Sequence, residues 1–200
     1  MATSKVDIVN RALRKIKSVR IQTLNENTPE GRDAISIYDE SREFLLKRGI
    51  WTWAIGRQKL AQLSATPAFE YDYAYRLPAD YIRIAGAYSD SSARARIRDY
   101  RLESAGLTCN AQDVYLRYIK NEEDPNKFGA DFRAAFEDYM AYQLALALPG
   151  SKSLADGHLE RFERISLPRA MSTEAIDDGE YEWPDSEWTT ERWSSGGGGW

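Results

Sequence analysis

The chain has 200 residues, of which 42% are hydrophobic and 29% charged, a composition typical of a globular protein that can bury a sizeable core. No apolar run approaches the roughly 18 residues of a membrane span, and the amino-terminal sequence lacks the apolar block of a signal peptide. The single cysteine, Cys109, cannot form an internal disulfide, which favours a reducing, cytoplasmic origin. We therefore expect no membrane association.

The charge is unevenly distributed along the chain. Residues 174–200 hold eight acids and one base, a net charge of −7, whereas residues 1–173 hold 23 acids and 26 bases, a net charge of +3. A basic body with an acidic tail predicts that the tail contacts a basic surface, on this chain or on another one. A solvated tail is the alternative that composition alone allows.

Two amphipathic helices are expected in residues 1–50. The first, over residues 5–17, follows Ser4 and Asp7, which have the spacing of a capping box. The second, over residues 30–48, begins after a Thr-Pro pair that is typical of a helix start, and it ends before a glycine. Both belong to the N-terminal part of a predicted helical bundle.

Residues 51–122 are expected to form a β-rich insert. Trp51, Trp53 and Ile55 alternate with smaller side chains, a period of two that is typical of a strand. Further extended segments are expected over residues 71–75, 81–88, 100–107 and 113–120. The apolar face of the last one is expected to consist of Val114, Leu116 and Tyr118.

Residues 123–175 are expected to return to helix. Apolar residues recur every four positions over 131–148, with Asp131 as the N-cap and a Pro-Gly pair at the end. A fourth helix is expected over 151–166, and Pro168 is expected to break or kink it. The order of elements predicts an α+β fold: an antiparallel helical bundle with an inserted antiparallel β region and an extended C-terminal tail.

Residues 176–200 do not resemble a folded domain. The segment is acidic, ends in a glycine run and carries four tryptophans: Trp183, Trp188, Trp193 and Trp200. Disordered tails are usually poor in aromatic residues, whereas tryptophan commonly anchors protein interfaces. The composition therefore favours an extended docking peptide for a partner protein over a plain disordered tail.

No catalytic, cofactor-binding or metal-binding motif is recognisable in the sequence. The one histidine, His158, has no second histidine or nearby cysteine with which to bind a metal, which favours a solvated helical residue. Cys109 is interpreted as a buried small residue in or near a hairpin. We therefore expect no enzyme activity, no cofactor and no metal.

Arginines recur with a period of two within the β-rich insert. Arg94, Arg96 and Arg98, with Arg101 just beyond, would share one face of an extended segment. Such a row suits a solvated sheet edge, a contact with an acidic segment such as the tail of another subunit, or contacts with DNA phosphates. The body charge of +3 is small for a dedicated DNA-binding module, so DNA is the least favoured of the three.

Trp51 and Trp53 allow two interpretations, a stacking platform for a ligand or the joint between helices and sheet. On a strand, two residues that are two positions apart point the same way and form one apolar block. The neighbouring sequence lacks the convergent polar groups of a ligand site. The pattern favours a helix–sheet joint.

Three short motifs occur in an order that is informative. RGIWTWAIGRQKL follows the second expected helix, YRLPADYI spans residues 75–82, and DPNKF spans residues 124–128 before the long helix. With these motifs, residues 5–170 resemble the head-to-tail adaptor proteins of tailed bacteriophages, in particular the tail tubular protein A family of short-tailed phages. The tryptophan-rich tail is not a general feature of that family.

The resemblance implies a structural virion protein at the head–tail junction, assembled in the cytoplasm of a host bacterium. It implies a ring, usually of twelve copies, that docks under a portal protein, contacts a downstream tail or nozzle protein, and lines part of the DNA exit channel without sequence-specific contacts. The family brings no catalytic residues. Two alternatives remain: a virion-associated cell-wall hydrolase and a DNA-binding packaging factor.

Overall fold

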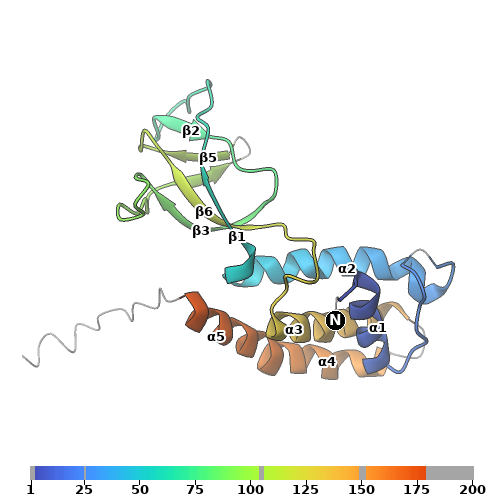
Figure 1. The fold of residues 1–200 in the computed structure, drawn as a ribbon. Helices are drawn as coiled ribbons and strands as arrows, with labels where there is room; N and C mark the ends of the chain where they lie inside the picture. The colour runs from blue at the N-terminus through green and yellow to red at the C-terminus, as the bar shows by residue number, and fades with distance from the viewer. Residues whose placement is uncertain (1–2, 25, 104–105, 149–151, 179–200) are drawn as a thin grey trace, which may run out of the picture.

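The computed structural model describes residues 3–24, 26–103, 106–148 and 152–178. In these residues the chain forms a helical lobe and a β lobe that meet at the carboxyl end of helix α2 (Figure 1). The helices and the two small antiparallel sheets confirm the expected α+β class. The tail tryptophans Trp183, Trp188, Trp193 and Trp200 lie outside the described residues.

The helical lobe is built around α3. Its helices are α1 (Lys5–Lys15), α2 (Pro29–Arg48), α3 (Ala130–Ala147), α4 (Ala155–Arg161) and α5 (Leu167–Asp178), with the π-helical segment η3 (Phe162–Ser166) between α4 and α5 and the 3-10 turns η1 (Thr52–Ala54) and η2 (Lys152–Leu154). α3 packs against α1, α2, α4 and α5. Its residues Phe132, Phe136, Met140 and Leu144 are almost completely buried, as the four-residue repeat predicts.

Local sequence signals determine where the first two helices begin. The Ser4 hydroxyl accepts a hydrogen bond from the Asp7 N–H, and the Asp7 carboxylate accepts one from the Ser4 N–H, which confirms the capping box. The Thr28 hydroxyl accepts a hydrogen bond from the Gly31 N–H, and Pro29 is the first residue of α2. Gly49 follows the last residue of this helix, as expected.

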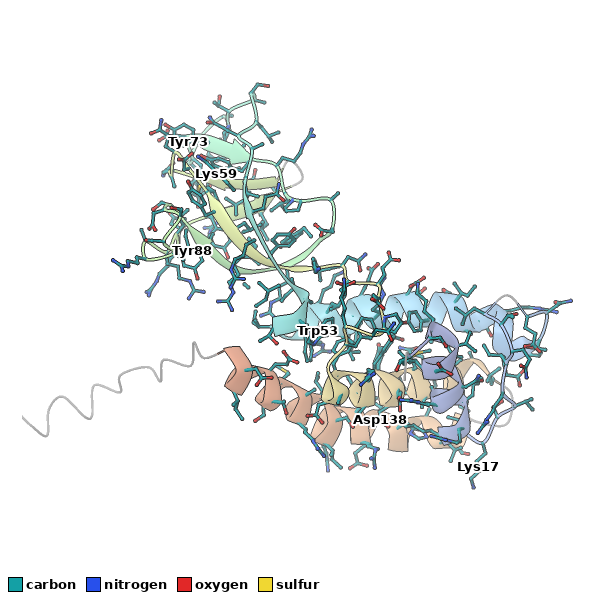
Figure 2. All side chains as sticks on the ribbon, in the orientation of Figure 1. Lys17, Trp53, Lys59, Tyr73, Tyr88 and Asp138 are labelled. Atoms are coloured by element: carbon teal, nitrogen blue, oxygen red, sulfur yellow. The ribbon has the colours of Figure 1, made fainter. Side chains whose placement is uncertain are left out.

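Asp138 is a charged side chain in the interior of the helical lobe. Asp138, on α3, is 2% exposed, and its carboxylate is 2.7 Å from Lys15 Nζ of α1 and 3.2 Å from Arg161 Nε of α4 (Figure 2). The Ser166 hydroxyl, in the π-helical segment, also donates to this carboxylate. These bonds hold Asp138 in its charged form and connect α3 with α1, with α4 and with the π-helical segment.

The β lobe contains two three-stranded antiparallel sheets. One has the order β1-β6-β3 and the other the order β2-β5-β4. The strands are β1 (Ile55–Lys59), β2 (Tyr73–Tyr75), β3 (Tyr81–Tyr88), β4 (Arg101–Glu103), β5 (Gly106–Cys109) and β6 (Tyr115–Lys120). A small core between the sheets includes Tyr75, Leu107, Cys109, Leu116 and Tyr118.

Strand β6 contributes to two cores. Leu116 and Tyr118 belong to the β lobe core, as the alternation predicts. Ile119, on the other face, is fully buried in the core of the helical lobe. Val114, Leu116 and Tyr118 thus belong to one core as expected, and helices also bury Ile119 on the second face of the strand.

Two expected segments of the β-rich insert differ in the structure. Residues 52–54 form a 3-10 turn, so the strand begins at Ile55 and not at Trp51. The expected single segment over 100–107 is divided between β4 and β5, which pair with each other, and Gly106 at the start of β5 has φ = 136°. A positive φ of this size is accessible to glycine and rarely to other residues.

Three details of the C-terminal helices also differ from expectation. The residue that precedes α3 as its N-cap is Gly129, and Asp131 instead lies in the first turn, 3.1 Å from Arg169 of α5. Pro168 does not end the helical run, because it is the second residue of α5, directly after a π-helical segment that alters the hydrogen-bond pattern. The run continues to Asp178, so the expected boundary at residue 176 falls inside α5.

Candidate functional site

The joint between the two lobes is aromatic. Trp51 is fully buried, and its ring lies edge-on to Phe132 of α3, with the ring centroids 4.7 Å apart. Trp53 also meets Phe132 edge-on, at 4.8 Å, and contacts Phe128 at 5.1 Å (Figure 2). Both tryptophans therefore pack into the helical lobe, directly before the strand that enters the β lobe.

The indole nitrogens of these two residues have different surroundings. Trp51 Nε1 donates to the Leu45 carbonyl of α2 at 3.0 Å. Trp53 Nε1 is buried, and none of the described residues accepts a hydrogen bond from it. Both rings pack against Phe132, and the Trp53 ring also packs against Phe128, so the geometry describes a packing joint.

The turn motif at residues 75–82 supports the first sheet. The Asp80 carboxylate accepts a hydrogen bond from the Tyr118 hydroxyl at 3.0 Å, and the Asp80 carbonyl accepts one from the Asn121 N–H at 2.6 Å. Burial raises the pKa of Tyr118 to about 12, and the bond to Asp80 acts in the same direction. The motif thus connects the turn before β3 to the end of β6.

The motif at residues 124–128 shapes the return from the β lobe to α3. The Asp124 carboxylate accepts hydrogen bonds from the N–H and the side chain of Asn126, and the side-chain carbonyl oxygen of Asn126 accepts one from the Thr3 N–H. Phe128, at the end of the motif, packs against Trp53. The second and third motifs therefore both contribute to connections near the joint.

Hydrogen bonds and ion pairs of charged side chains stabilise the same return segment. Arg42 of α2 is 2% exposed and donates to the Glu122 carbonyl at 3.0 Å and to the Asn121 side chain. The Glu122 carboxylate lies 2.9 Å from Lys127 Nζ and 3.0 Å from Lys120 Nζ. Burial by itself favours the protonated acid, but the hydrogen bonds from Lys127 and Lys120 lower the pKa of Glu122 to about 2.

The arginines that form the predicted basic row are exposed in the β lobe. Arg94, Arg96 and Arg98 lie in the connection between β3 and β4, which is turn-rich and not a continuous strand, and Arg101 begins β4. Arg101 Nη2 is 3.9 Å from the Glu70 carboxylate. The structure therefore does not place Arg94, Arg96 and Arg98 on one face of a regular strand, although all are accessible to solvent.

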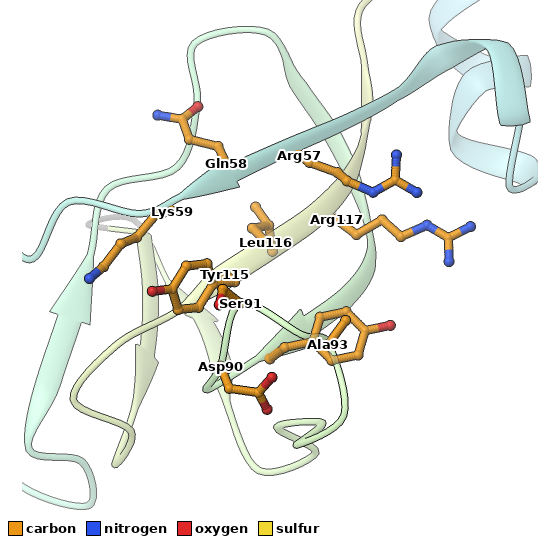
Figure 3. A pocket seen from close by; sticks show the side chains of 10 residues that line it. Arg57, Gln58, Lys59, Asp90, Ser91, Ala93, Tyr115, Leu116 and Arg117 are labelled. Atoms are coloured by element: carbon orange, nitrogen blue, oxygen red, sulfur yellow. The ribbon is translucent and has the colours of Figure 1, made fainter.

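A pocket of about 350 Å³ lies on the β1-β6-β3 sheet. Figure 3 shows its lining, in which Arg57 of β1 and Arg117 of β6 extend side by side. The two residues are direct partners in the antiparallel register, so they lie on the same face of the sheet. Arg57 is far more accessible than Arg117, which is only 9% exposed.

The rest of the pocket combines aromatic rings with further charges. Tyr115 pairs in register with both Lys59 and Tyr88, so the three form one row across the sheet. Lys59 Nζ lies 2.9 Å from the Asp113 carboxylate and 5.4 Å from the centre of the Tyr115 ring. Asp90, at the rim, accepts hydrogen bonds from the N–H groups of the turn that follows it, and hydrogen bonding with Ser92 holds the pKa of its carboxyl below the usual value.

The sequence did not identify Arg57 and Arg117 as a pair. They are 60 positions apart, and only the strand register brings them together. The basic residues predicted from their spacing lie in the neighbouring loop. The lining of the pocket thus holds three basic residues, Arg57, Lys59 and Arg117, and one acidic residue, Asp90, a net charge of +2.

Cys109 and His158, the other two residues considered from the sequence, lie in a strand and in a helix. Cys109 is fully buried in β5, and burial raises the pKa of its thiol. His158 is half-buried on α4. Within the described ranges, no group of three or more His, Cys, Asp or Glu residues could hold a metal ion. No helix of the described part is long and apolar enough to cross a membrane.

Comparison of the chain with protein-family models and with curated proteins finds no match. The candidate site is therefore defined by its own residues: the aromatic joint, the exposed arginine loop and the basic pocket on the first sheet.

Proposed function

We propose that this protein is a head-to-tail adaptor of a tailed bacteriophage, of the tail tubular protein A type. The observation that carries the proposal is the ordered set of three motifs in the sequence. The first contains Trp51 and Trp53, which pack at the joint, and the third ends in Phe128, which contacts Trp53. The second motif, residues 75–82, contains the turn before β3. Residues of the first and third motifs thus lie where the lobes are joined.

In this role, copies of the chain form a ring, usually a dodecamer, at the head–tail junction of the virion. The ring binds a portal protein on one side and a downstream tail or nozzle protein on the other, and DNA passes through it without sequence-specific contacts. Ring closure needs two unlike patches on each subunit. The acidic C-terminal segment and the basic surface of the β lobe have the unlike charges that such a contact uses.

The test is reconstitution with the portal protein of the same phage. Full-length chain mixed with portal rings should co-sediment with them, and negative-stain micrographs should show an added ring layer. A variant with Trp183, Trp188 and Trp193 changed to Ala should bind more weakly if these residues contact the portal. Absence of any association between the full-length chain and portal rings, at micromolar concentrations and moderate salt, would overturn the proposal.

A second candidate function is DNA binding, favoured by the solvent exposure of Arg94, Arg96 and Arg98. This candidate predicts an affinity for duplex DNA that decreases steeply with salt, because each phosphate contact releases counterions. Fluorescence anisotropy with labelled DNA, at about 50 mM and about 200 mM salt, tests it. Absence of binding at the lower salt excludes a DNA-binding role.

A further inference from the structure

A groove lies between helices α2 and α3 of the helical lobe. It consists of two neighbouring pockets, of about 230 Å³ and about 380 Å³, and Ile37 of α2 and Gln143 of α3 line both of them. Phe44 and Tyr139 contribute aromatic rings to the smaller pocket, and the exposed Leu146 contributes an apolar side chain to the larger one. We refer to the two pockets together as the α2–α3 groove.

The charge of the α2–α3 groove is negative. Asp33 and Glu40, both exposed residues of α2, line it, and no basic residue does, so the net charge of the lining is −2. Glu40 accepts a hydrogen bond from the Ser36 hydroxyl at 2.8 Å. Within the described ranges, neither carboxylate has an ion-pair partner. The groove therefore presents two carboxylates that a basic segment can neutralise.

A buried hydroxyl in the smaller pocket also lacks a partner. Ser41 is 1% exposed, and no described residue forms a hydrogen bond with its Oγ atom. Buried polar atoms are nearly always paired, so an N–H donor that enters this pocket would gain an acceptor. The adjacent Phe44 ring, which stacks on Tyr139 at 4.4 Å, already has the Arg48 guanidinium group 4.5 Å above its centre. Acid, acceptor and aromatic ring together suit an arginine side chain.

The β lobe carries an exposed segment with the complementary charge. Arg94, Arg96 and Arg98 belong to residues 93–98, which we call the arginine loop, and all three are exposed. Arg96 Nη2 donates to the Ala85 carbonyl at 3.5 Å, but in the part of the chain that the structure describes none of the three arginines forms an ion pair. The carboxylate of Asp90, just before the loop, is occupied by N–H groups of the turn that follows it.

The spacing of the charges is comparable in the groove and in the loop. Asp33 and Glu40 are seven positions apart on one helix, which corresponds to about 10 Å along its axis. Arg94 and Arg98 are four positions apart, which corresponds to at most about 13 Å in an extended segment. The two outer arginines can therefore face the two carboxylates at the same time.

The arginine loop that meets this groove has to come from a second copy of the chain. The Ile97 N–H donates to the Ala87 carbonyl at 2.8 Å, which anchors the loop to β3 in the β lobe. The β lobe meets the helical lobe at the carboxyl end of α2 (Figure 1). Asp33 precedes the last residue of this helix, Arg48, by 15 positions, or about 22 Å. The fold thus holds the loop of the same chain away from the groove.

We infer that the arginine loop of one copy docks in the α2–α3 groove of a second copy. Loop and groove are different surfaces of the same chain, so each copy can bind one neighbour with its loop and another with its groove. Closure of such contacts into a ring rests on the proposed function, whereas the contact between two copies does not.

Photo-cross-linking of the full-length protein, in the absence of portal protein, tests this contact. A photoreactive benzoylphenylalanine replaces Leu146 in the groove, which is 44% exposed, and in a control protein it replaces Met171 of α5, which is 41% exposed. After irradiation and digestion with chymotrypsin, mass spectrometry should find peptides with residues 93–98 attached at position 146 and not at position 171. Attachment of another segment, residues 179–200 included, or no attachment at position 146 overturns the inference.

Charge reversal and mixing show whether the contact is specific and joins two molecules. A groove variant carries Asp33→Arg and Glu40→Arg, and a loop variant carries Arg94→Glu, Arg96→Glu and Arg98→Glu. Each variant alone should lose at least about fivefold in cross-link yield at position 146, because like charges then face each other. An equal mixture of the two should restore the yield, because the acidic loop of one variant meets the basic groove of the other. No restoration in the mixture overturns the inference.

The control for the groove variant changes two exposed acids outside the groove. Glu160→Arg and Glu163→Arg together alter the net charge as much as the groove variant does, and they should leave the yield unchanged. An equal loss in this control reduces the contact to non-specific electrostatics and overturns the assignment. All the reversed side chains are exposed, and unchanged thermal unfolding shows that the variants remain folded. Because no portal is present, failure of this contact is distinguishable from failure of the wild-type chain to co-sediment with portal rings.

Discussion

The Glu174 carboxylate accepts two hydrogen bonds from Thr52, one from the backbone N–H at 2.8 Å and one from the hydroxyl at 2.7 Å. Glu174 is 7% exposed and belongs to α5, whereas Thr52 begins the 3-10 turn that leads into β1. The Glu174 side chain thus caps the start of the 3-10 turn. It also connects α5 with the segment that leads into β1.

Glu174→Ala is expected to destabilise the protein by about 1–3 kcal/mol, because it leaves the Thr52 N–H and hydroxyl without their acceptor. Urea unfolding followed by circular dichroism measures the change. The control is Glu160→Ala, which removes an exposed ion pair with Arg164 and should change stability by about 0–1 kcal/mol. Equal losses in the two variants contradict a capping role for Glu174.

Trp51 and Trp53 are expected to respond differently to replacement by phenylalanine. Trp51→Phe removes the hydrogen bond to the Leu45 carbonyl, whereas Trp53→Phe removes a buried N–H that has no acceptor among the described residues. Both variants lose ring area against Phe132. Trp51→Phe should therefore lower the free energy of unfolding by about 1 kcal/mol more than Trp53→Phe does.

Urea unfolding of the two variants, followed by far-ultraviolet circular dichroism, provides the comparison without dependence on tryptophan emission. A larger loss in Trp53→Phe would mean that the packing of the second ring outweighs the hydrogen bond of the first. In that case, the burial of Trp51 is not the dominant contribution to the joint.

Short-range signals predicted the parts of the fold that depend on few residues. The capping box of Ser4 and Asp7 and the start at Thr28 are set by bonds that span three positions, so the sequence is sufficient. The prediction that a strand begins at Trp51 was wrong, because three alternating apolar residues are too few to distinguish a strand from a 3-10 turn. Contacts of both tryptophans with Phe132, about 80 positions away, determine that conformation.

The candidate site was less predictable than the fold, because it depends on strand register. The loop arginines stood out by their spacing, but the pair Arg57 and Arg117 has no such signal in the sequence. The extension of α5 past Pro168 was missed for a related reason. The π-helical segment that precedes it includes Ser166, which donates to the distant Asp138.

Gly106 and Gly157 form a matched pair for a test of the β lobe. Gly106 has φ = 136°, and a Cβ there would lie 2.0 Å from the Tyr75 carbonyl oxygen. Gly106→Ala should therefore lower the free energy of unfolding by about 2 kcal/mol or more, through backbone strain and a clash across the β2–β5 pair. Gly157, on α4, has nothing within 4 Å of an added Cβ, so Gly157→Ala should gain about 0.5–1 kcal/mol.

Thermal unfolding distinguishes these outcomes, because the two substitutions should shift the midpoint in opposite directions. Two-dimensional NMR of Gly106→Ala should show the largest shifts in β2, β4 and β5. A neutral effect of Gly106→Ala contradicts the described conformation at this turn.

The free energy of unfolding should decrease in acid because of Glu122. Its pKa is lowered from 4.5 to about 2 by Lys127 and Lys120, which outweigh the opposing effect of burial. A carboxyl whose folded pKa lies below its unfolded value contributes stability that is full above the unfolded pKa and is lost as the pH falls toward the folded pKa. This contribution should therefore decline between pH 4.5 and about pH 2. Asp138, whose pKa is also lowered, adds to the decline in the same direction.

Glu122→Gln isolates the first contribution. At neutral pH the variant should be less stable than the wild type by about 2–3 kcal/mol, a value that follows from the size of the pKa shift with allowance for the partly exposed lysines. The difference should shrink as the pH falls below 4.5, because the Glu122 carboxyl then becomes protonated in the unfolded wild-type chain while it stays ionised in the folded protein until about pH 2. Glu123→Gln is the control, because the Glu123 side chain is 66% exposed and its carboxylate comes no closer than 4.0 Å to Lys5 Nζ. Urea unfolding at a series of pH values gives the measurement, and a difference between wild type and Glu122→Gln that stays constant down to about pH 2 would show that the loss is one of packing and not of charge.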